Sequence, residues 1–329
     1  MTGTGFIGWV AAALALTGPA AAQTPDAQAL YRQILELSEP DAFAAPAGPV
    51  TVDHAAHPDA QSETWLIVAH LSDGNGAPVT LHANLSRLGL RGKAASDLDV
   101  TTLWRGHLIV LPTDADPWAE ERVSRGLGAA GADPKAVWID DWTLDTTSPA
   151  NLSLTTDALS LTLDTAASAD PLLADDPELP FRGYTLPSVP VTATLDGQTL
   201  TGTAWIDHLW GDVPVPGGPL AYDRLILHLD DGSAVSLLRT RRQDGQGIAT
   251  LDGTLTDPSG RTVSLSDATV DLTEDQLAGA GLDLTLDTSR TATAPFAFPL
   301  TTRMLTAAGT RNGTPVNGLG SLQLSGTPE

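Results

Sequence analysis

The chain has 329 residues, of which 42% are hydrophobic, enough to bury one large core or two smaller ones. Its formal net charge is -23, and so acidic a surface repels nucleic acids and anionic membranes, which excludes them as partners. The chain has no cysteine, so disulfides and cysteine nucleophiles are excluded as well.

The first 22 residues have the pattern of a secretory signal peptide. An apolar run from Phe6 to Leu16 precedes a Gly-Pro breaker and Ala20-Ala21-Ala22, a small-residue cleavage site. The run is too short to span a bilayer comfortably, and no later stretch is long and apolar enough. We therefore expect a signal peptide over residues 1–22 and a periplasmic or secreted mature protein without an integral membrane span.

The next segment predicts a short N-terminal helix, because Leu30, Ile34 and Leu37 form one apolar stripe before Pro40 ends it. From there on the pattern is that of strands. Short apolar runs, often alternating and rich in Thr and Val, are separated by turn sequences such as DGNG, LDGQ and DPSG. The expected strands are 65–71, 79–85, 107–111, 136–144, 158–163, 189–195, 200–210, 225–229, 234–239, 248–255 and 282–286.

This series of strands predicts an all-β fold of barrels or sandwiches, and closing a barrel is the best way to remove exposed strand edges. The clearest boundary is GDVPVPGGPL, Gly211–Leu220, because Pro and Gly prevent a continuous central strand there. We expect an N-terminal domain over residues 23–213 and a C-terminal domain over residues 214–329.

The segment GTAWIDHLWG, residues 202–211, concentrates chemistry-bearing side chains in one expected strand. Since alternate residues share a face, His208 and Trp210 point one way, whereas Trp205 and Asp207 point the other. His208 and Trp210 therefore offer a ligand a titratable ring and an aromatic wall. The competing interpretation is a buried histidine among core tryptophans.

A second candidate lies in AYDRLILHLDDGS, where Asp223 continues the apolar stripe of Leu225 and Leu227 while Tyr222 falls on the opposite face. A carboxyl group buried among leucines has a raised pKa and can act as a general acid near neutral pH. Alternatively, Asp223 caps backbone amides or pairs with an arginine. The pattern alone leaves both readings open.

Two further clusters carry histidines or tryptophans. VDHAAHPDAQSETWLIVAHL contains His54 and His57 before Trp65, but the rest of the chain has no matching Cys/His motif, so we expect no metal. In AVWIDDWTLD, strand alternation places Trp138 and Trp142 on one face, where they would line a barrel.

Known catalytic motifs are missing: the chain has no G-x-S-x-G elbow, no P-loop and no G-x-G-x-x-G that directly follows one of the expected strands. The functions that remain open are acid–base catalysis and ligand binding without catalysis.

The order of these motifs resembles one family. DHAAHPDAQSETWLIVAHL, VWIDDWTLD, RGYTLPSVPVTATLDGQTLTGTAWIDHLWG, LHLDDGSAVSLLRTRRQDG and GLGSLQLSG are similar, in this order, to the carotenoid hydratase (hydroxyneurosporene synthase) and secreted AttH-like family. The resemblance implies two packed lipocalin-like β-barrels with a ligand pocket, and in some members the addition of water to an isoprenoid double bond without a cofactor.

By motif position, the resemblance implies catalytic roles for His208 and Trp210, with Tyr222 and Asp223 as counterparts of a downstream Tyr and Asp. Tyr222 and Asp223 could line one pocket only if a β-bulge follows the linker. Several positions of the family pattern differ here, since Arg224 stands in place of a Trp, Ser321 in place of a Tyr and Gln323 in place of a Glu. These changes weaken the case for a long carotenoid as ligand.

Two functions follow. In the first, the protein binds an apolar, isoprenoid or lipid-like ligand and hydrates a C=C bond without a cofactor, with His208 and Asp223 as catalytic residues. Ligand contacts would come from Trp210, Tyr222, Trp65 and Trp142. In the second, it is a non-catalytic carrier of a hydrophobic ligand or an accessory subunit of an ABC-type export system, with a transporter as its partner.

Overall fold

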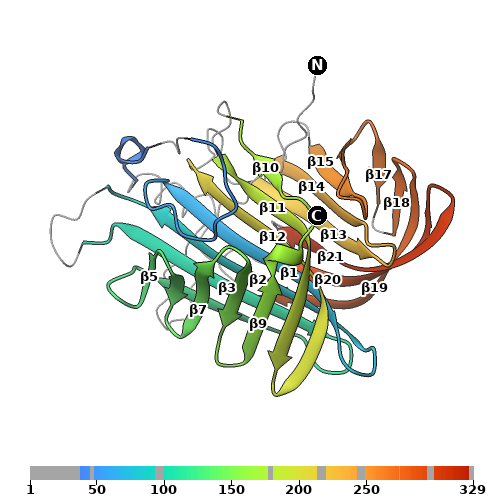
Figure 1. Ribbon diagram of the computed structural model, residues 1–329, viewed down its shortest axis with the longest axis horizontal. Coiled ribbons are helices and arrows are strands. Elements are labelled where there is room, and N and C mark those ends of the chain that lie inside the picture. Colours follow the sequence, from blue (N-terminus) through green and yellow to red (C-terminus); the bar gives the residue numbers. More distant parts are fainter. Residues whose placement is uncertain are drawn as a thin grey trace.

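The chain is almost entirely β-structure in the part that the computed structural model describes (Figure 1). The described residues are 38–44, 48–92, 99–176, 181–212, 220–242, 249–273, 275–294 and 300–325. Two short 3-10 helices, η1 (Pro40–Ala42) and η2 (Thr165–Ala167), accompany the strands. The signal peptide and the N-terminal helix expected from the sequence lie outside the described residues. No helix within the described ranges is long and apolar enough to cross a membrane.

The first sheet contains twelve strands of the described chain and curls into a nearly closed barrel. Neighbours follow the order β4-β3-β2-β1-β12-β11-β9-β8-β7-β6-β5, with β10 beside β11. Its strands are β1 (Ser62–Ser72), β2 (Pro78–Gly89), β3 (Thr102–Pro112), β4 (Trp118–Ser124), β5 (Ala130–Asp133), β6 (Ala136–Ile139), β7 (Trp142–Ser148), β8 (Asn151–Thr155), β9 (Leu159–Asp164), β10 (Leu172–Ala174), β11 (Phe181–Leu195) and β12 (Gln198–Gly211).

The second sheet contains nine described strands and forms the second nearly closed barrel, in the order β16-β15-β14-β13-β21-β20-β19-β18-β17. Its strands are β13 (Leu220–Leu229), β14 (Ala234–Arg242), β15 (Thr250–Thr256), β16 (Thr262–Ser266), β17 (Val270–Leu272), β18 (Gln276–Gly279), β19 (Leu282–Ala294), β20 (Leu300–Arg311) and β21 (Thr314–Ser325). The two barrels confirm the expected fold class. The chain passes from the first sheet to the second between Gly211 and Leu220.

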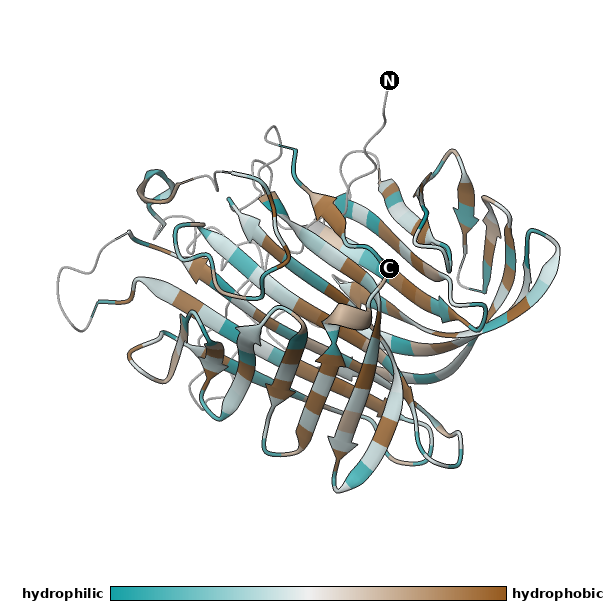
Figure 2. Cartoon of the chain, in the orientation of Figure 1, coloured by the Kyte–Doolittle hydropathy of each residue, from teal (hydrophilic) through white to brown (hydrophobic). Residues whose placement is uncertain are grey.

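Each barrel has its own apolar interior, and residues alternate between apolar and polar along many strands (Figure 2). The interior of the first barrel combines aliphatic side chains with Trp65, Trp142, Tyr184 and Trp210. The interior of the second is mostly leucine and valine. Chemistry-bearing side chains therefore concentrate in the first barrel.

The barrels pack through the outer faces of a few central strands. Trp205 of β12 and Val68 of β1 form one apolar cluster with Ile226 of β13. A second cluster joins Ile109 of β3 to Tyr222 of β13, among other residues. Because these strands are buried on both faces, their polar outward residues need partners within the protein.

One expected strand is wrong. Residues 136–144 form a hairpin, β6 and β7, with a turn at Asp140 and Asp141, and Asp140 has a positive φ of 54°. The turn interrupts the alternation that the sequence suggested. Trp138 consequently points away from the core and is half-buried, whereas Trp142 is buried inside the first barrel.

Candidate active site in the first barrel

Strand register brings the inward-facing residues of the first barrel into two adjacent rows. In β1 and β12, Trp65 lies opposite His208 and Glu63 lies opposite Trp210. Residues directly opposite on neighbouring strands share a face, so all four side chains enter the same interior. As alternation predicts, Asp207 points to the other side of the sheet.

The flanking strands extend both rows. Arg87 of β2 lies opposite Glu63, and its Nε donates to Glu63 Oε2 at 2.8 Å. Tyr184 of β11 lies opposite His208, and their rings meet edge to face at 5.4 Å between centroids. The preceding residue, Gly183, has a φ of +147°, and a Cβ there would lie 2.1 Å from the His208 carbonyl oxygen. Only glycine allows β11 to lie so close to β12.

A loop that precedes β1 closes over these rows. The backbone N–H of His57 donates to both oxygens of Glu63 at 2.9 and 3.0 Å, and its ring Nδ1 lies 2.9 Å from Glu63 Oε1. The indole N–H of Trp65 donates to the carbonyl of His54 at 3.1 Å, and the Tyr184 hydroxyl donates to that of Asp53 at 2.6 Å. The loop is thus fixed by polar contacts from the barrel interior.

Glu63 is a fully buried carboxylate at the centre of this network. Its Oε1 also accepts from His208 Nε2 at 2.9 Å. Burial alone would raise the pKa of Glu63, but the hydrogen bonds from His208 and His57 and the charge of Arg87 outweigh it and hold that pKa at about 2. Glu63 is therefore ionised at neutral pH and accepts hydrogen bonds only.

The other titratable groups respond mainly to burial. Burial lowers the pKa of His208, with the bond to Glu63 acting in the opposite direction. Burial and the nearby His208 lower the pKa of His54 to about 4. Burial raises the pKa of the Tyr184 hydroxyl well above its ordinary value, and the carboxylates of Asp53 and Glu63 add to this. Tyr184 therefore stays protonated and acts as a hydrogen-bond donor.

Aromatic rings surround the two histidines. The His57 and Trp210 rings stack at 3.6 Å between centroids with 7° between their planes, and Trp65 stacks on His208 at 4.9 Å. The indole N–H of Trp210 is buried without a hydrogen-bond partner in the described structure, as is that of Trp142. Unpaired buried donors are rare and mark places where a ligand oxygen can bind.

The structure brings together only some of the residues expected from the sequence. His208, Trp210 and Trp65 meet in the first barrel, and Trp142 lies in the same interior against β3, where a Cβ on Gly106 would come within 2.9 Å of its ring. Asp223 lies in the second barrel.

Asp223 does not meet His208, since it is ion-paired with Arg241 at 2.7 Å at one end of the second barrel. The pairing alternative for this residue is therefore the one that the structure contains. Tyr222 faces the first barrel from outside and donates to Gln323 at 3.1 Å. The register of β13 has no bulge at these residues, so Tyr222 and Asp223 point to opposite faces.

Sequence reasoning missed the roles of Glu63, Arg87 and Tyr184. Glu63 and His57 belong to a histidine-rich segment that the sequence offers only as a weak metal motif. Strand alternation, extended back from Trp65, would have placed the side chains of Trp65 and Glu63 on one face. Arg87 and Tyr184 could be assigned only with the register of β2 and β11.

His57, Glu63 and His208 each offer one ligand atom within 4.8 Å of the other two, a donor set that could hold a metal ion. Each atom is already hydrogen-bonded, and the guanidinium of Arg87 offsets the charge of the carboxylate. The network is therefore satisfied by hydrogen bonds and one ion pair.

All four remaining histidines are buried outside the first barrel's interior. His70 and His228 join the two barrels through their Nδ1 atoms, 2.8 Å apart, and His82 Nε2 lies 2.9 Å from the Ser321 hydroxyl. His107 lies beside His82. These histidines lie between the barrels and are not part of the network inside the first barrel.

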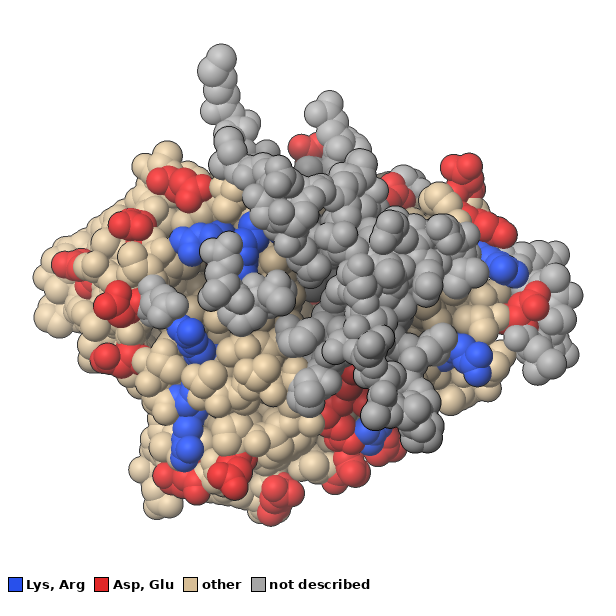
Figure 3. Space-filling model, turned by 180° about the vertical axis from the view of Figure 1, so that it is seen from behind, with Lys and Arg blue, Asp and Glu red and all other residues tan. Residues whose placement is uncertain are grey.

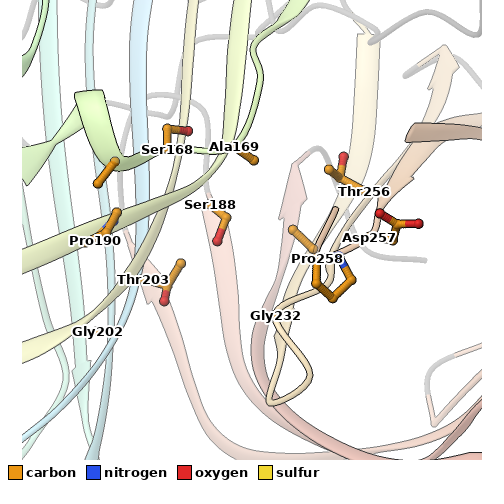
Figure 4. Close-up of a pocket in the computed structure, with 12 residues that line it drawn as sticks. Ser168, Ala169, Ser188, Pro190, Gly202, Thr203, Gly232, Thr256, Asp257 and Pro258 are labelled. Atoms are coloured by element: carbon orange, nitrogen blue, oxygen red, sulfur yellow. The ribbon is translucent and has the colours of Figure 1, made fainter. Parts of the chain in front are cut away.

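A cavity of about 400 Å³ also lies between the barrels (Figure 4). On the first barrel it is lined by small residues such as Ser188 and Thr203, and on the second by turns that contain Gly232 and Pro258. None of the residues of the His57–Glu63–His208 network lines it. We therefore place the candidate active site in the first barrel.

The surface carries acidic side chains around the margins of the face shown in Figure 3, with basic side chains between them. On this face they do not gather into one patch over a single element.

The comparisons with known proteins agree with this fold. A profile of the family described as AttH-like matches residues 43–280. A crystal structure assigned as an AttH from Nitrosomonas europaea superposes with a TM-score of 0.66 at 18% identity, covering 85% of this chain and 98% of that one. Kievitone hydratase from Nectria haematococca gives a TM-score of 0.56 at 12% identity, covering 87% and 97%. No curated protein sequence matches significantly.

Proposed function

Because the chain belongs to the AttH-like family, we propose that its first barrel binds a small apolar ligand and adds water to a C=C bond in it. The observation that carries this proposal is the network of His57, Glu63, Arg87 and His208 inside a mostly apolar barrel. Burying an ionised carboxylate is costly, and apolar side chains would fill the same space more cheaply. Such a network is best explained by acid–base chemistry.

The ligand class follows from the walls of the site. Trp65 and Trp210 offer flat apolar surfaces, and the rest of the first barrel's interior is mostly aliphatic. The unpaired indole N–H groups of Trp210 and Trp142 add two hydrogen-bond donors. A mostly apolar molecule with one or two oxygens, such as an oxygenated isoprenoid, fits both features.

The reaction class rests on the side chains and on one similar structure. The site holds groups that can exchange protons, and adding water to a double bond needs no net oxidation or reduction. One protein with a similar fold is named as a hydratase. At 12% identity it shares the fold alone, so hydration is our proposal for this chain.

We also propose that the protein acts in the periplasm or outside the cell, since residues 1–22 have the pattern of a signal peptide. Fractionation of the source cells, with detection by an antibody, would test this separately from activity.

The test of the function uses isotopically labelled water. The purified protein is incubated with a panel of short oxygenated isoprenoids, and mass spectrometry detects products that have gained one molecule of label. We expect label in the wild type and its loss in Glu63→Gln. The matched control is Glu120→Gln, which changes a carboxylate on the outer strand β4 that is ion-paired with Arg122. Ligand retained in native mass spectrometry without labelled product would instead make the protein a carrier.

A further inference from the structure

His57 differs from the other histidines of the network in being accessible. Its side chain is 26% exposed, whereas those of His208 and Glu63 are fully buried. His208 Nε2–H donates to Glu63 at 2.9 Å, and Nδ1 is enclosed by the Tyr184 hydroxyl at 3.2 Å and the Asp53 carbonyl at 3.1 Å. His57 is therefore the ring that can reach a ligand without breaking the network.

The carboxylate fixes which nitrogen of His57 is available. Glu63 accepts hydrogen bonds only, so the 2.9 Å contact requires the hydrogen of His57 to sit on Nδ1. A neutral imidazole then has a lone pair on Nε2. In the described structure Nε2 has no hydrogen-bond partner. A carboxylate that orients a histidine in this way prepares its other nitrogen to accept a proton.

Trp210 completes the arrangement. Its ring lies parallel to that of His57 at 3.6 Å, and its indole N–H is buried without a partner. A base and an unused hydrogen-bond donor thus sit on two stacked rings. A substrate that uses both groups needs a carbon to which water can add and an oxygen that accepts a hydrogen bond.

We infer that His57 is the catalytic base of the hydration, through Nε2, and that the substrate is an alkene conjugated to a carbonyl group. This inference rests on the proposed function and names the residue and the substrate class. His57 Nε2 takes a proton from water while the water oxygen bonds to the β-carbon. The π electrons move onto the carbonyl oxygen, which accepts from Trp210 Nε1–H, and the proton then returns from Nε2 to the α-carbon.

Conjugation is required because an imidazole exchanges protons efficiently near neutral pH but is only a weak acid when protonated. An isolated alkene must be protonated to a carbocation, which needs a far stronger acid than an imidazolium. An enolate, in contrast, forms by addition of a nucleophile and is stabilised by one well-placed donor. Glu63 is a positioning residue, since it acts through His57.

Two matched probes test the substrate class. Citral contains an alkene conjugated to its aldehyde, and citronellal lacks that double bond but keeps the isolated one. We expect the wild type to add one molecule of labelled water across the conjugated C=C bond of citral and to leave the C=C bond of citronellal unchanged. Hydration of citronellal at an equal rate would overturn the assignment of a conjugated substrate.

Two variants test His57. His57→Ala should lower kcat for citral by about 100-fold or more, with little change in KM, and added imidazole should restore part of the rate. His57→Gln, which keeps a polar side chain beside Glu63, should be equally slow but not respond to imidazole. A wild-type kcat in either variant would overturn the role of His57 and leave the proposed hydration standing. Lack of labelled product in the wild type with every substrate would overturn the proposed function itself.

Nitrogen NMR of labelled histidine gives a readout that does not depend on turnover. At neutral pH we expect the hydrogen of His57 on Nδ1, and its loss from that position in Glu63→Gln. A hydrogen on Nε2 in the wild type would contradict the inference.

Discussion

Asp207 of the first barrel and Arg224 of the second form a buried ion pair, one residue from His208, which faces the opposite side of the same strand. The Asp207 carboxylate also accepts from Thr185 at 2.6 Å and from the Trp205 indole at 2.8 Å. Neighbouring residues of one short motif therefore serve two purposes. Asp207 joins the barrels, and His208 supports the active-site network.

Removal of one partner of this pair should destabilise the protein strongly. Arg224→Met leaves the Asp207 charge buried and unpaired, so we expect the free energy of unfolding to fall by about 3–5 kcal/mol. Urea unfolding followed by circular dichroism measures it. The control is Arg261→Met, since Arg261 is 77% exposed and water screens its pair with Asp257, so its loss should change the stability little. Equal losses in both variants would show that the interface pair has no special role.

Gly183→Ala should disrupt the strand pair that carries His208. The new Cβ would lie 2.1 Å from the His208 carbonyl oxygen at a φ of +147°, so β11 must move away from β12. We expect a loss of about 3 kcal/mol or more in the free energy of unfolding, together with altered tryptophan fluorescence. Gly197→Ala is the matched control, because its φ is +80° but no atom lies within 4 Å of the new Cβ. It should cost only about 1–2 kcal/mol, and a similar cost at Gly183 would contradict the packing seen here.

Stability should fall in acid because buried histidines stay neutral in the folded protein. Burial lowers the pKa of His228 to about 4 and that of His82 to about 3, from 6.5 in the unfolded chain. Below 6.5 the unfolded chain binds more protons than the folded one, so stability is fully present above 6.5 and is lost as the pH falls. Each such histidine contributes a slope of about 1.4 kcal/mol per pH unit down to its folded pKa.

His228→Asn tests this directly, since it removes one titrating group from the layer between the barrels. Urea unfolding across this pH range should give a shallower slope for the variant than for the wild type. The lowered pKa of Glu63 acts in a more acidic window, since its contribution is present above about 4.5 and is lost as the pH falls through about 2. A slope unchanged by His228→Asn would mean that His228 does not stay neutral as the pH falls.

The sequence predicted the all-β fold and the strand face on which each motif residue lies, because both depend on local alternation. His208 and Trp210 turn inward and Trp205 turns outward, as a period of two requires. Alternation failed where a tight turn at Asp140 looked like a continuous strand. In that segment, two adjacent aspartates between apolar runs were the only available signal.

The candidate site was harder to predict because it depends on register between strands far apart in the chain. Glu63 and His208 are 145 residues apart and meet only because β1 pairs with β12. Asp223 illustrates the opposite case, since an apolar stripe suggested a buried acid. The partner that neutralises it, Arg241, comes from β14 and is visible only once the hairpin is formed. Local pattern fixes the face of a residue, whereas tertiary pairing fixes its charge environment.

Glu63→Gln should show that the carboxylate holds the active-site network together. An amide has one acceptor oxygen where the carboxylate has two, and its NH2 group would face the donors of Arg87 or the histidines. The Arg87 guanidinium, whose side chain is only 5% exposed, would then lack its countercharge. We expect the free energy of unfolding to fall by about 3–5 kcal/mol, as for other broken buried pairs.

The double variant Glu63→Gln/Arg87→Met separates the ion pair from the rest of the network. It removes the unpaired charge, so it should recover part of the stability lost in Glu63→Gln, with a coupling energy of about 0.5–3 kcal/mol. It should not restore the Nδ1 hydrogen of His57 or the rate of hydration, because both depend on the carboxylate itself. Recovery of the rate would instead mean that Arg87, and not the orientation of His57, limits catalysis when Glu63 is changed.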